Sequence, residues 1–517
     1  MQIPPRELRR RIVPRWRSIL RTPVEELENH CKQGPVDSSV IHELQRRVEQ
    51  WEGQKTSEAA QELLWAASVF GHHTATTKAL RAMADSGDLP EPIRDSARDL
   101  VAEKVITRSE LPIQLDTRKF LQERIHALKE RILIAPHDPV QYIELARFYS
   151  RLGQSDQAKR SITIACGLAP SARFILRAAT RCLVHIEDYD CAIKILERGN
   201  PADPWIQAAR ISVSDLGGRP VPDVKRARAT LESDVHPKHL SELAGSLATV
   251  EHGSGNISRS KRLFRQCAID PNDNAIAQLL WASQNRIIEF KPELLERSLT
   301  FEARTAFARR EKRWTDALLH CADWMQDEPF SLRPATVGSF VAAEILQDYD
   351  KSIEFCETGL IANPDNFVLL NNLAFCHTAK GNIETGADFL KAAQSEIRTK
   401  MDEIIFLATS GMISFRKGQQ DVGVSNYTRA IDLALAAGLS EIAQLATVHY
   451  LAEVANSGSF FSMQEIEQIS TMMQSKQILP EVRDIYSARL KPLLAEHHKQ
   501  PGPRGAIQTS IPQLFTD

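Results

Sequence analysis

The feature that most constrains this 517-residue chain is a pattern of large and small residues that returns after 34 positions. In "LARFYSRLGQSDQA", residues 145–158, the pattern has helical spacing and is interrupted by a glycine turn. Ala158 returns as Ala192, and Pro170 returns as Pro204. One helical pair cannot bury its apolar side alone, so we expect the copies to stack side by side.

The pattern is most complete in residues 139–172. Its places are occupied there by Tyr142, Leu145, Ala146, Tyr149, Gly153, Ala158, Ile162, Ala165 and Pro170. This unit resembles the tetratricopeptide repeat, with Tyr142 at the usual tryptophan place and Ala146 at the usual glycine place. The resemblance implies an all-α fold, a right-handed α-solenoid of stacked helical hairpins. Its concave face would be lined by the first helix of each hairpin.

The resemblance covers roughly residues 139–436 and is clearest at 139–204 and 333–400. A solenoid must cover its terminal apolar faces, so we expect helical caps at both ends. The predicted division is a basic N-terminal arm (1–35), divergent helical hairpins (36–135), a first repeat block (139–300, degenerate after 205), a second repeat block (301–436), C-terminal capping helices (437–498) and a flexible tail (499–517).

Composition and motifs exclude several functional classes. The net charge is −2, so an electrostatic partner would need a local patch, and no apolar run is long enough to span a membrane. The eight cysteines form no CxxC pair, and we find no secretory signal, which predicts a reducing, cytoplasmic location. Catalytic and metal-ligand motifs are not found, so we predict no enzymatic activity, no metal and no cofactor.

A basic stripe is predicted on the concave wall of the first block. Arg147 and Arg151 lie one helical turn apart, and Arg177, Arg181 and His185 continue at the same spacing in the next unit. Such a stripe could bind an acidic peptide, a phosphate or a nucleic-acid backbone. An ordinary solvated helix face is the alternative.

The matching face of the second block is apolar and carries two amides. The candidate residues there are Val341, Asn371, Asn372, Phe375, Met412 and Phe415. An aromatic and methionine surface suits a bound helix or peptide. The resemblance implies that Asn372 would hydrogen-bond the main chain of an extended peptide. The alternative is that these residues pack against a neighbouring helix of the same chain.

The N-terminal stretch "RELRRRIVPRWRSILR" holds seven arginines and a single acid in residues 6–21. It could be a transit peptide, although its prolines would break an amphipathic helix, or an arm that binds nucleic acid or an acidic partner. A solvated tail is the third interpretation. Trp16 and Ile19 favour docking of part of the stretch on another surface.

Three functions are compatible with these patterns. The first is a non-catalytic scaffold or adaptor whose concave face binds a protein segment that is acidic at one end and apolar at the other. The second is a nucleic-acid-associated regulator that uses the N-terminal arginines and the basic stripe. The third is a regulatory subunit of a separate enzyme. A repeat fold supports all three, so the fold by itself does not choose between them.

Overall fold

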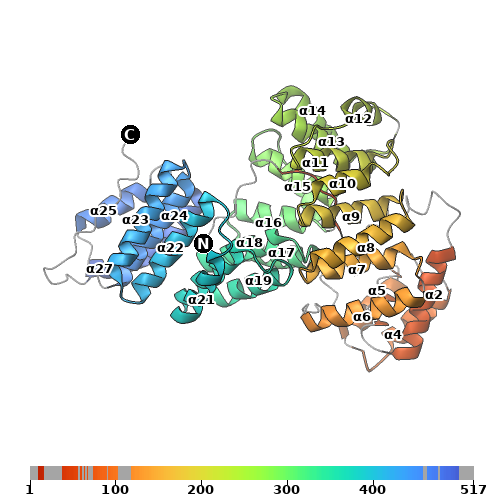
Figure 1. Cartoon of the computed structure of the whole chain (residues 1–517), viewed down its shortest axis with the longest axis horizontal. Helices are drawn as coiled ribbons and strands as arrows, with labels where there is room; N and C mark the ends of the chain where they lie inside the picture. The colour runs from red at the N-terminus through yellow and green to blue at the C-terminus, as the bar shows by residue number, and fades with distance from the viewer. Residues whose placement is uncertain are drawn as a thin grey trace. The chain divides into compact units, whose positions relative to one another are not determined.

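The computed structural model describes residues 10–16, 38–55, 59–60, 63–64, 67, 74–89, 91–102, 118–134, 136–233, 235–297, 299–457, 463–474 and 478–499. Across these residues every regular element is helical (Figure 1). The chain divides into two compact units. We call them the N-terminal unit, residues 9–303, and the C-terminal unit, from residue 304 onward.

The N-terminal unit is a series of helices joined by short connections. Its helices are α2 (Ser38–Gln54), α4 (Thr74–Ala84), α5 (Glu91–Val101), α6 (Arg118–Ile134), α7 (Pro139–Arg151), α8 (Ser155–Leu168), α9 (Arg173–His185), α10 (Tyr189–Leu196), α11 (Pro204–Leu216), α12 (Val224–Leu231), α13 (Pro237–Gly253), α14 (Ile257–Cys267), α15 (Asp273–Gln284) and the short 3₁₀ helix η3 (Pro292–Glu296). Helix α16 (Phe301–Arg310) spans the junction between the units.

The C-terminal unit continues in the same manner. Its helices are α17 (Trp314–Asp327), α18 (Leu332–Phe340), the π-helical turn η4 (Val341–Ile345), α19 (Tyr349–Ala362), α20 (Phe367–Ala379), α21 (Ile383–Gln394), α22 (Lys400–Arg416), α23 (Gln420–Ala436), α24 (Ser440–Asn456), α25 (Met463–Gln474), α26 (Pro480–Ile485), the π-helical turn η5 (Tyr486–Leu490) and α27 (Lys491–Lys499).

Helices pair into hairpins, and each hairpin packs on the next. In the N-terminal unit α7 packs on α8, α9 on α10 and α13 on α14, while the first helices α7, α9, α11, α13 and α15 contact one another in sequence. The C-terminal unit repeats this with the first helices α18, α20, α22 and α24. The predicted all-α, tetratricopeptide-like stack of helical hairpins is therefore confirmed. We call these first helices the A helices of each unit.

Local sequence sets the ends of the A helices. Asp138 and Asp203 each precede a proline, and their carboxylates accept the backbone N–H of Val140 and Trp205 at 2.9 Å. This arrangement satisfies a helix N–H group that would otherwise lack a partner. After α7, Gly153 turns the chain with a φ of 71°, a conformation that residues with a Cβ rarely adopt.

Small residues let the two helices of a hairpin approach closely. Ala158 and Ala192, the pair separated by the repeat period, are both fully buried. Gly386 in α21 lies against α20, where an added Cβ would come within 2.2 Å of the Thr378 hydroxyl oxygen and 2.9 Å of the Ala374 carbonyl oxygen. Six of the seven described cysteines are also buried and all seven are free thiols, as expected for small core residues.

The close approach at Gly386 predicts a stability effect. Gly386→Ala should lower the free energy of unfolding by about 1–3 kcal/mol, because α20 and α21 must move apart. Gly167→Ala is the matched control, since a Cβ at this helical glycine would meet no atom within 4 Å. Because alanine has a higher helix propensity than glycine, Gly167→Ala should leave the free energy of unfolding unchanged or raise it by up to ~1 kcal/mol. Urea denaturation measures both, and equal effects would contradict the prediction.

Candidate peptide-binding face

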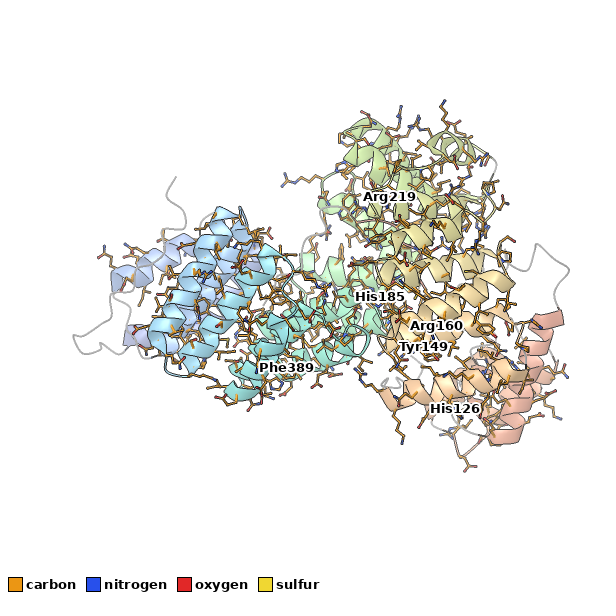
Figure 2. The ribbon with its side chains drawn as sticks, viewed as in Figure 1. His126, Tyr149, Arg160, His185, Arg219 and Phe389 are labelled. Carbon is orange, nitrogen blue, oxygen red and sulfur yellow. The ribbon has the colours of Figure 1, made fainter. Side chains whose placement is uncertain are left out.

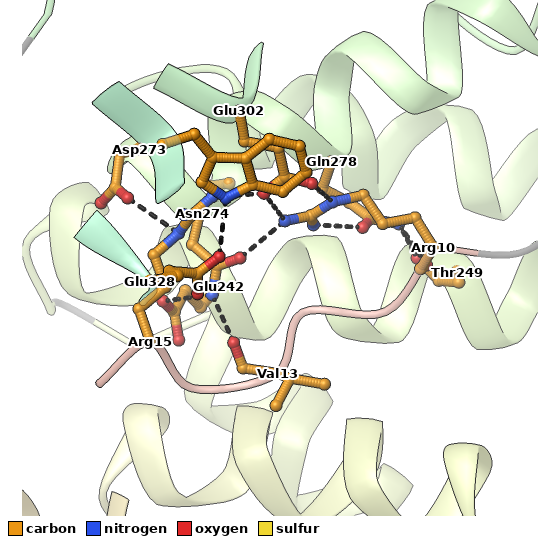
Figure 3. Close-up of polar contacts among 12 residues, drawn as sticks. Arg10, Val13, Arg15, Glu242, Thr249, Asp273, Asn274, Gln278, Glu302 and Glu328 are labelled. Atoms are coloured by element: carbon orange, nitrogen blue, oxygen red, sulfur yellow. Dashed lines mark hydrogen bonds and ion pairs between the residues drawn. The ribbon is translucent and has the colours of Figure 1, made fainter. Parts of the chain in front are cut away.

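Residues 10–16 form a non-helical segment that lies along the A helices of the N-terminal unit (Figure 3). Ile12 and Trp16 in this segment are 0% and 1% exposed. The expected docking of Trp16 is therefore confirmed, whereas Ile19 lies outside the described residues. The segment is held by a set of residues that we call the segment face. They are Asp215 of α11, Gly245 of α13, Asp273, Asn274 and Gln278 of α15, and Glu302 of α16, together with Glu242 and Thr249 of α13, which accept hydrogen bonds from Asn274 and Gln278.

Arg10 makes the most extensive side-chain contacts. Its guanidinium forms a two-pronged ion pair with Glu302, in which Nε and Nη2 each lie 2.9 Å from a carboxylate oxygen. Nη1 donates to the amide oxygen of Gln278 at 2.8 Å, and Nη2 also donates to that of Asn274 at 2.9 Å. All these side chains are buried, so the charges are shielded from water and the geometry is fixed by several bonds at once.

The face also binds the main chain of the segment. The Gln278 amide nitrogen donates to the Arg10 carbonyl at 2.9 Å, and the Asn274 amide nitrogen donates to the Val13 carbonyl at 2.9 Å. Both amides lie one turn apart on α15. Each therefore contacts a backbone carbonyl with its nitrogen and the Arg10 side chain with its oxygen, as Figure 3 shows.

Two further arginines bind acids of the face. Arg15 Nε lies 2.9 Å from Asp273, and its Nη2 lies 2.5 Å from Glu302, so Glu302 pairs with two arginines of the segment. Arg11 Nε lies 2.9 Å from Asp215 in a partly exposed pair. Buried charges of one sign are costly without counter-charges, so the acids of the face and the arginines of the segment depend on each other.

A glycine makes room for the apolar side chain of the segment. A Cβ at Gly245 would lie 2.6 Å from the Ile12 terminal methyl and 3.2 Å from the Cys267 sulfur. The segment bends at this point, since the Val13 N–H donates to the Arg11 carbonyl at 3.0 Å, which closes a γ-turn centred on Ile12. Ile12 therefore enters the face at the tip of a turn.

One predicted residue lies directly behind the segment face. Arg177 donates to Glu242 at 3.0 Å and to the Trp205 carbonyl at 3.2 Å, and its guanidinium lies 4.8 Å from the Trp205 ring. Glu242 in turn accepts from Asn274 at 3.1 Å. Arg177 therefore supports the residue that binds the Val13 carbonyl.

The other members of the basic stripe are on α7 and α9. Arg147 and Arg151 are buried beside the Phe148 ring, and Arg147 lies 4.0 Å from Glu144. His185, labelled in Figure 2, is partly buried together with Arg181. Burial, with a smaller effect of Arg181, lowers the pKa of His185 to about 3, so this histidine is neutral at pH 7. Partner binding by these residues stays a prediction.

The apolar candidates of the second block are all buried in the C-terminal unit. Val341, Asn371, Asn372, Phe375, Met412 and Phe415 are each less than a tenth exposed. Phe415 packs on Tyr427 and Tyr450, and Asn372 donates to the Ser339 hydroxyl at 3.1 Å. These contacts match the alternative of packing within the chain. Partner binding by these six residues stays a prediction.

Part of this packing comes from the C-terminal helices. Arg489 of η5 lies 5.2 Å from the Phe375 ring centre and 3.0 Å from the Glu344 carboxylate, and it donates to the Tyr349 hydroxyl at 3.0 Å. His449 of α24 lies 3.2 Å from the same carboxylate. Burial by itself would raise the pKa of Glu344, but His449 and Arg489 lower it well below its usual range. Arg489 and His449, from the residues predicted to form the C-terminal cap, therefore join Glu344 in a buried charge cluster, and the capping role itself stays a prediction.

Sequence reasoning missed the segment face, because residues 205–300 have a degenerate repeat pattern. A signal was present in "DNAIAQ", where Asn274 and Gln278 are one helical turn apart on an A helix. The main-chain contact that the resemblance assigned to Asn372 is made by Asn274. The arginine-rich stretch of residues 6–21 was a second signal, because its charge is opposite to that of the acids of the segment face.

No protein-family model and no curated protein sequence match this chain. Solved structures with matching helices include one of the APC/C hetero-tetramer Cut9–Hcn1, with 12% identity, TM-score 0.36, and 86% of this chain and 91% of that chain covered. The human IFIT1 dimer with PPP-AAAA is 14% identical with TM-score 0.33, and the match covers 76% of this chain and 95% of that chain. Yeast Tom70 is 12% identical with TM-score 0.30, and the match covers 74% of this chain and 96% of that chain. The assignment of a tetratricopeptide-like fold therefore depends on the hairpins of this chain itself.

Glu302 predicts how firmly the segment is held. Glu302→Gln removes the counter-charge shared by Arg10 and Arg15, and breaking a buried pair typically costs about 3–5 kcal/mol. Trypsin cleavage after Arg11 and Arg15, followed by mass spectrometry, should become at least about tenfold faster. Asp190→Asn is the control, because this acid pairs with Arg219 on the surface and should leave the cleavage rate unchanged. Equal rates in all three chains would contradict the ion-pair argument.

The Glu344 cluster predicts loss of stability in acid. A carboxyl group whose pKa is lower in the folded chain than in the unfolded chain stabilises the fold. This stabilisation is complete above the pKa of the unfolded chain, about 4.3, and is lost as the pH falls toward the pKa of the folded chain. Burial lowers the pKa of His449, so protonation below about pH 6.5 also favours the unfolded chain. Protonation of Glu344 and protonation of His449 therefore both lower the free energy of unfolding as the pH falls.

Glu344→Gln should therefore lower the free energy of unfolding at pH 7 by about 3–5 kcal/mol and flatten its decline below about pH 4.3, where the Glu344 contribution is lost. Glu384→Gln is the control, because Glu384 is an exposed partner of Lys417 and an exposed pair contributes at most about 1 kcal/mol. Denaturant titrations at several pH values measure both variants. An unchanged pH profile for Glu344→Gln would refute the assignment.

Proposed function

We propose that the chain is a non-catalytic protein-interaction scaffold and that the segment face is its peptide-binding surface. The observation that carries this proposal is the way residues 10–16 are bound. The face contacts backbone carbonyls through Asn274 and Gln278 and side chains through Glu302 and Asp273. Contacts to both backbone and side chains allow a surface to bind a non-helical segment of another protein in the same manner.

The charge of the face determines the type of partner. The basic stripe by itself predicts an acidic partner segment, but Arg177 is neutralised by Glu242 within the chain. The acids that face the segment are Asp215, Asp273 and Glu302. We therefore propose a basic partner segment in place of the acidic one.

The nucleic-acid alternative is less well supported. It requires N-terminal arginines that are free to contact phosphates. Arg10 and Arg15 are instead buried against carboxylates, and Arg11 is paired with Asp215. A polyanion would have to compete with these acids for the same guanidinium groups.

A peptide supplied in trans tests the proposal. Residues 10–16 of the chain itself compete with an added peptide at a high effective concentration, on the order of millimolar for a short flexible tether. These residues must therefore first be released from the segment face. Arg10→Ala, Ile12→Asp and Arg15→Ala together define the opened chain. A labelled peptide of residues 9–17 should bind the opened chain saturably and bind the wild type at least about tenfold more weakly.

Arg219→Ala/Arg259→Ala is the matched control, because both arginines lie on the surface of the same unit and are about half exposed. It should behave as the wild type does in fluorescence anisotropy. Absence of saturable binding to an opened chain that keeps its helical circular dichroism would exclude the segment face as a peptide-binding surface.

A further inference from the structure

The segment face makes different contacts with the different positions of residues 10–15. Position 10 is bound through four hydrogen bonds or ion-pair contacts of its side chain, and position 12 fills the space above Gly245. Position 15 pairs with two acids, while position 13 is bound through its carbonyl. This difference between positions amounts to a sequence preference.

Position 10 requires arginine. The contacts of Arg10 use Nε, Nη1 and both hydrogens of Nη2, and they reach three different side chains of the face. A lysine ammonium is a single point with three donors and cannot place two parallel bonds on Glu302 while reaching Gln278 and Asn274. Lysine would leave buried acceptors without partners.

Position 12 requires a branched aliphatic residue. Ile12 is fully buried, and its terminal methyl lies only 2.6 Å from the place where a Cβ of residue 245 would be. The Cys267 sulfur lies 3.2 Å from the same Cβ position, so the space above Gly245 is narrow. A shorter side chain would leave an unfilled volume, and a charged one would be desolvated without a partner.

The spacing between the arginines is fixed by Glu302. One carboxylate binds both Arg10 and Arg15, although five extended residues would span roughly 17 Å. The γ-turn at Ile12 shortens this span and directs the isoleucine toward α13. A change in the number of residues between the two arginines would separate one of them from the shared acid.

We propose that the segment face recognises, in another protein, an unstructured segment with the pattern Arg–x–Ile–x–x–Arg. Residues 10–15 of this chain are then a resident copy of that ligand, and a partner binds by displacing them. This inference rests on the proposed function, since it names the class of partner for the same surface. Charge complementarity and the seated resident segment are the observations that support it.

A peptide panel on the opened chain tests the pattern. The reference peptide is residues 9–17, and its variants carry Arg10→Lys, Ile12→Ala, Arg15→Lys, or one added glycine between positions 13 and 14. A scrambled peptide of the same composition measures charge alone. Each substitution should weaken binding at least about tenfold, and scrambling at least about fiftyfold, because each removes contacts to buried groups of the face.

Gly245→Ala in the opened chain isolates the isoleucine contact. It should weaken binding of the reference peptide about tenfold or more, because the added methyl group occupies the space of Ile12. It should leave binding of the Ile12→Ala peptide nearly unchanged, since that peptide has no side chain to clash. If Gly245→Ala fails to fold, the peptide variants still decide the question.

The outcomes separate the two proposals. If no peptide binds the opened chain, the proposed function fails. If the reference, lysine and scrambled peptides bind equally well, the face binds basic peptides without a pattern, and only this inference is overturned. If the wild type forms a concentration-dependent dimer that the opened chain lacks, the segment serves a second copy of this chain, which also overturns it.

Discussion

The buried pairing of Glu302 with two arginines is the interaction on which the organisation of the N-terminal unit depends. Two guanidinium groups removed from water are stable only when counter-charges neutralise them, here Glu302 together with Asp273, and when their remaining hydrogen bonds are satisfied. Gln278 and Asn274 supply those bonds to Arg10 and bind the backbone at the same time. The segment and the surface beneath it therefore complete each other. Without the segment the face would carry acids and amides that lack partners.

The C-terminal unit solves a similar problem with a different element. The turn η4 presents Glu344, and the A helices α20 and α24 present Phe375 and His449; Arg489 from η5 covers them. This arginine stacks on an aromatic ring and neutralises a buried acid. Helix α26 and η5 add buried apolar residues, including Val482, Ile485 and Leu490, so the cover belongs to the core of the unit. The segment of residues 10–16 differs because its main chain is bound by side-chain amides, as a ligand would be.

Stacking of hairpins makes both arrangements possible. Alanine and glycine at the contacts between paired helices keep those helices close, so long side chains on the A helices of successive hairpins converge on one surface. Asp215, Glu242, Asn274 and Glu302 come from four different helices, α11, α13, α15 and α16, yet they contact one short segment or each other. A single helix could not supply this set of groups.

The sequence by itself determined the helical hairpins, because their signals are local. The repeat of Ala158 as Ala192, the caps at Asp138 and Asp203, and the glycine turn at Gly153 each depend on a few neighbouring residues. Only the tertiary structure decided which surface is occupied. The contact between Arg10 and Glu302 joins residues almost three hundred positions apart, and no periodicity records such a pairing. The same reason explains why Asn274 binds a main chain while Asn372 bonds to Ser339, since an asparagine on an A helix has the same local pattern in either role.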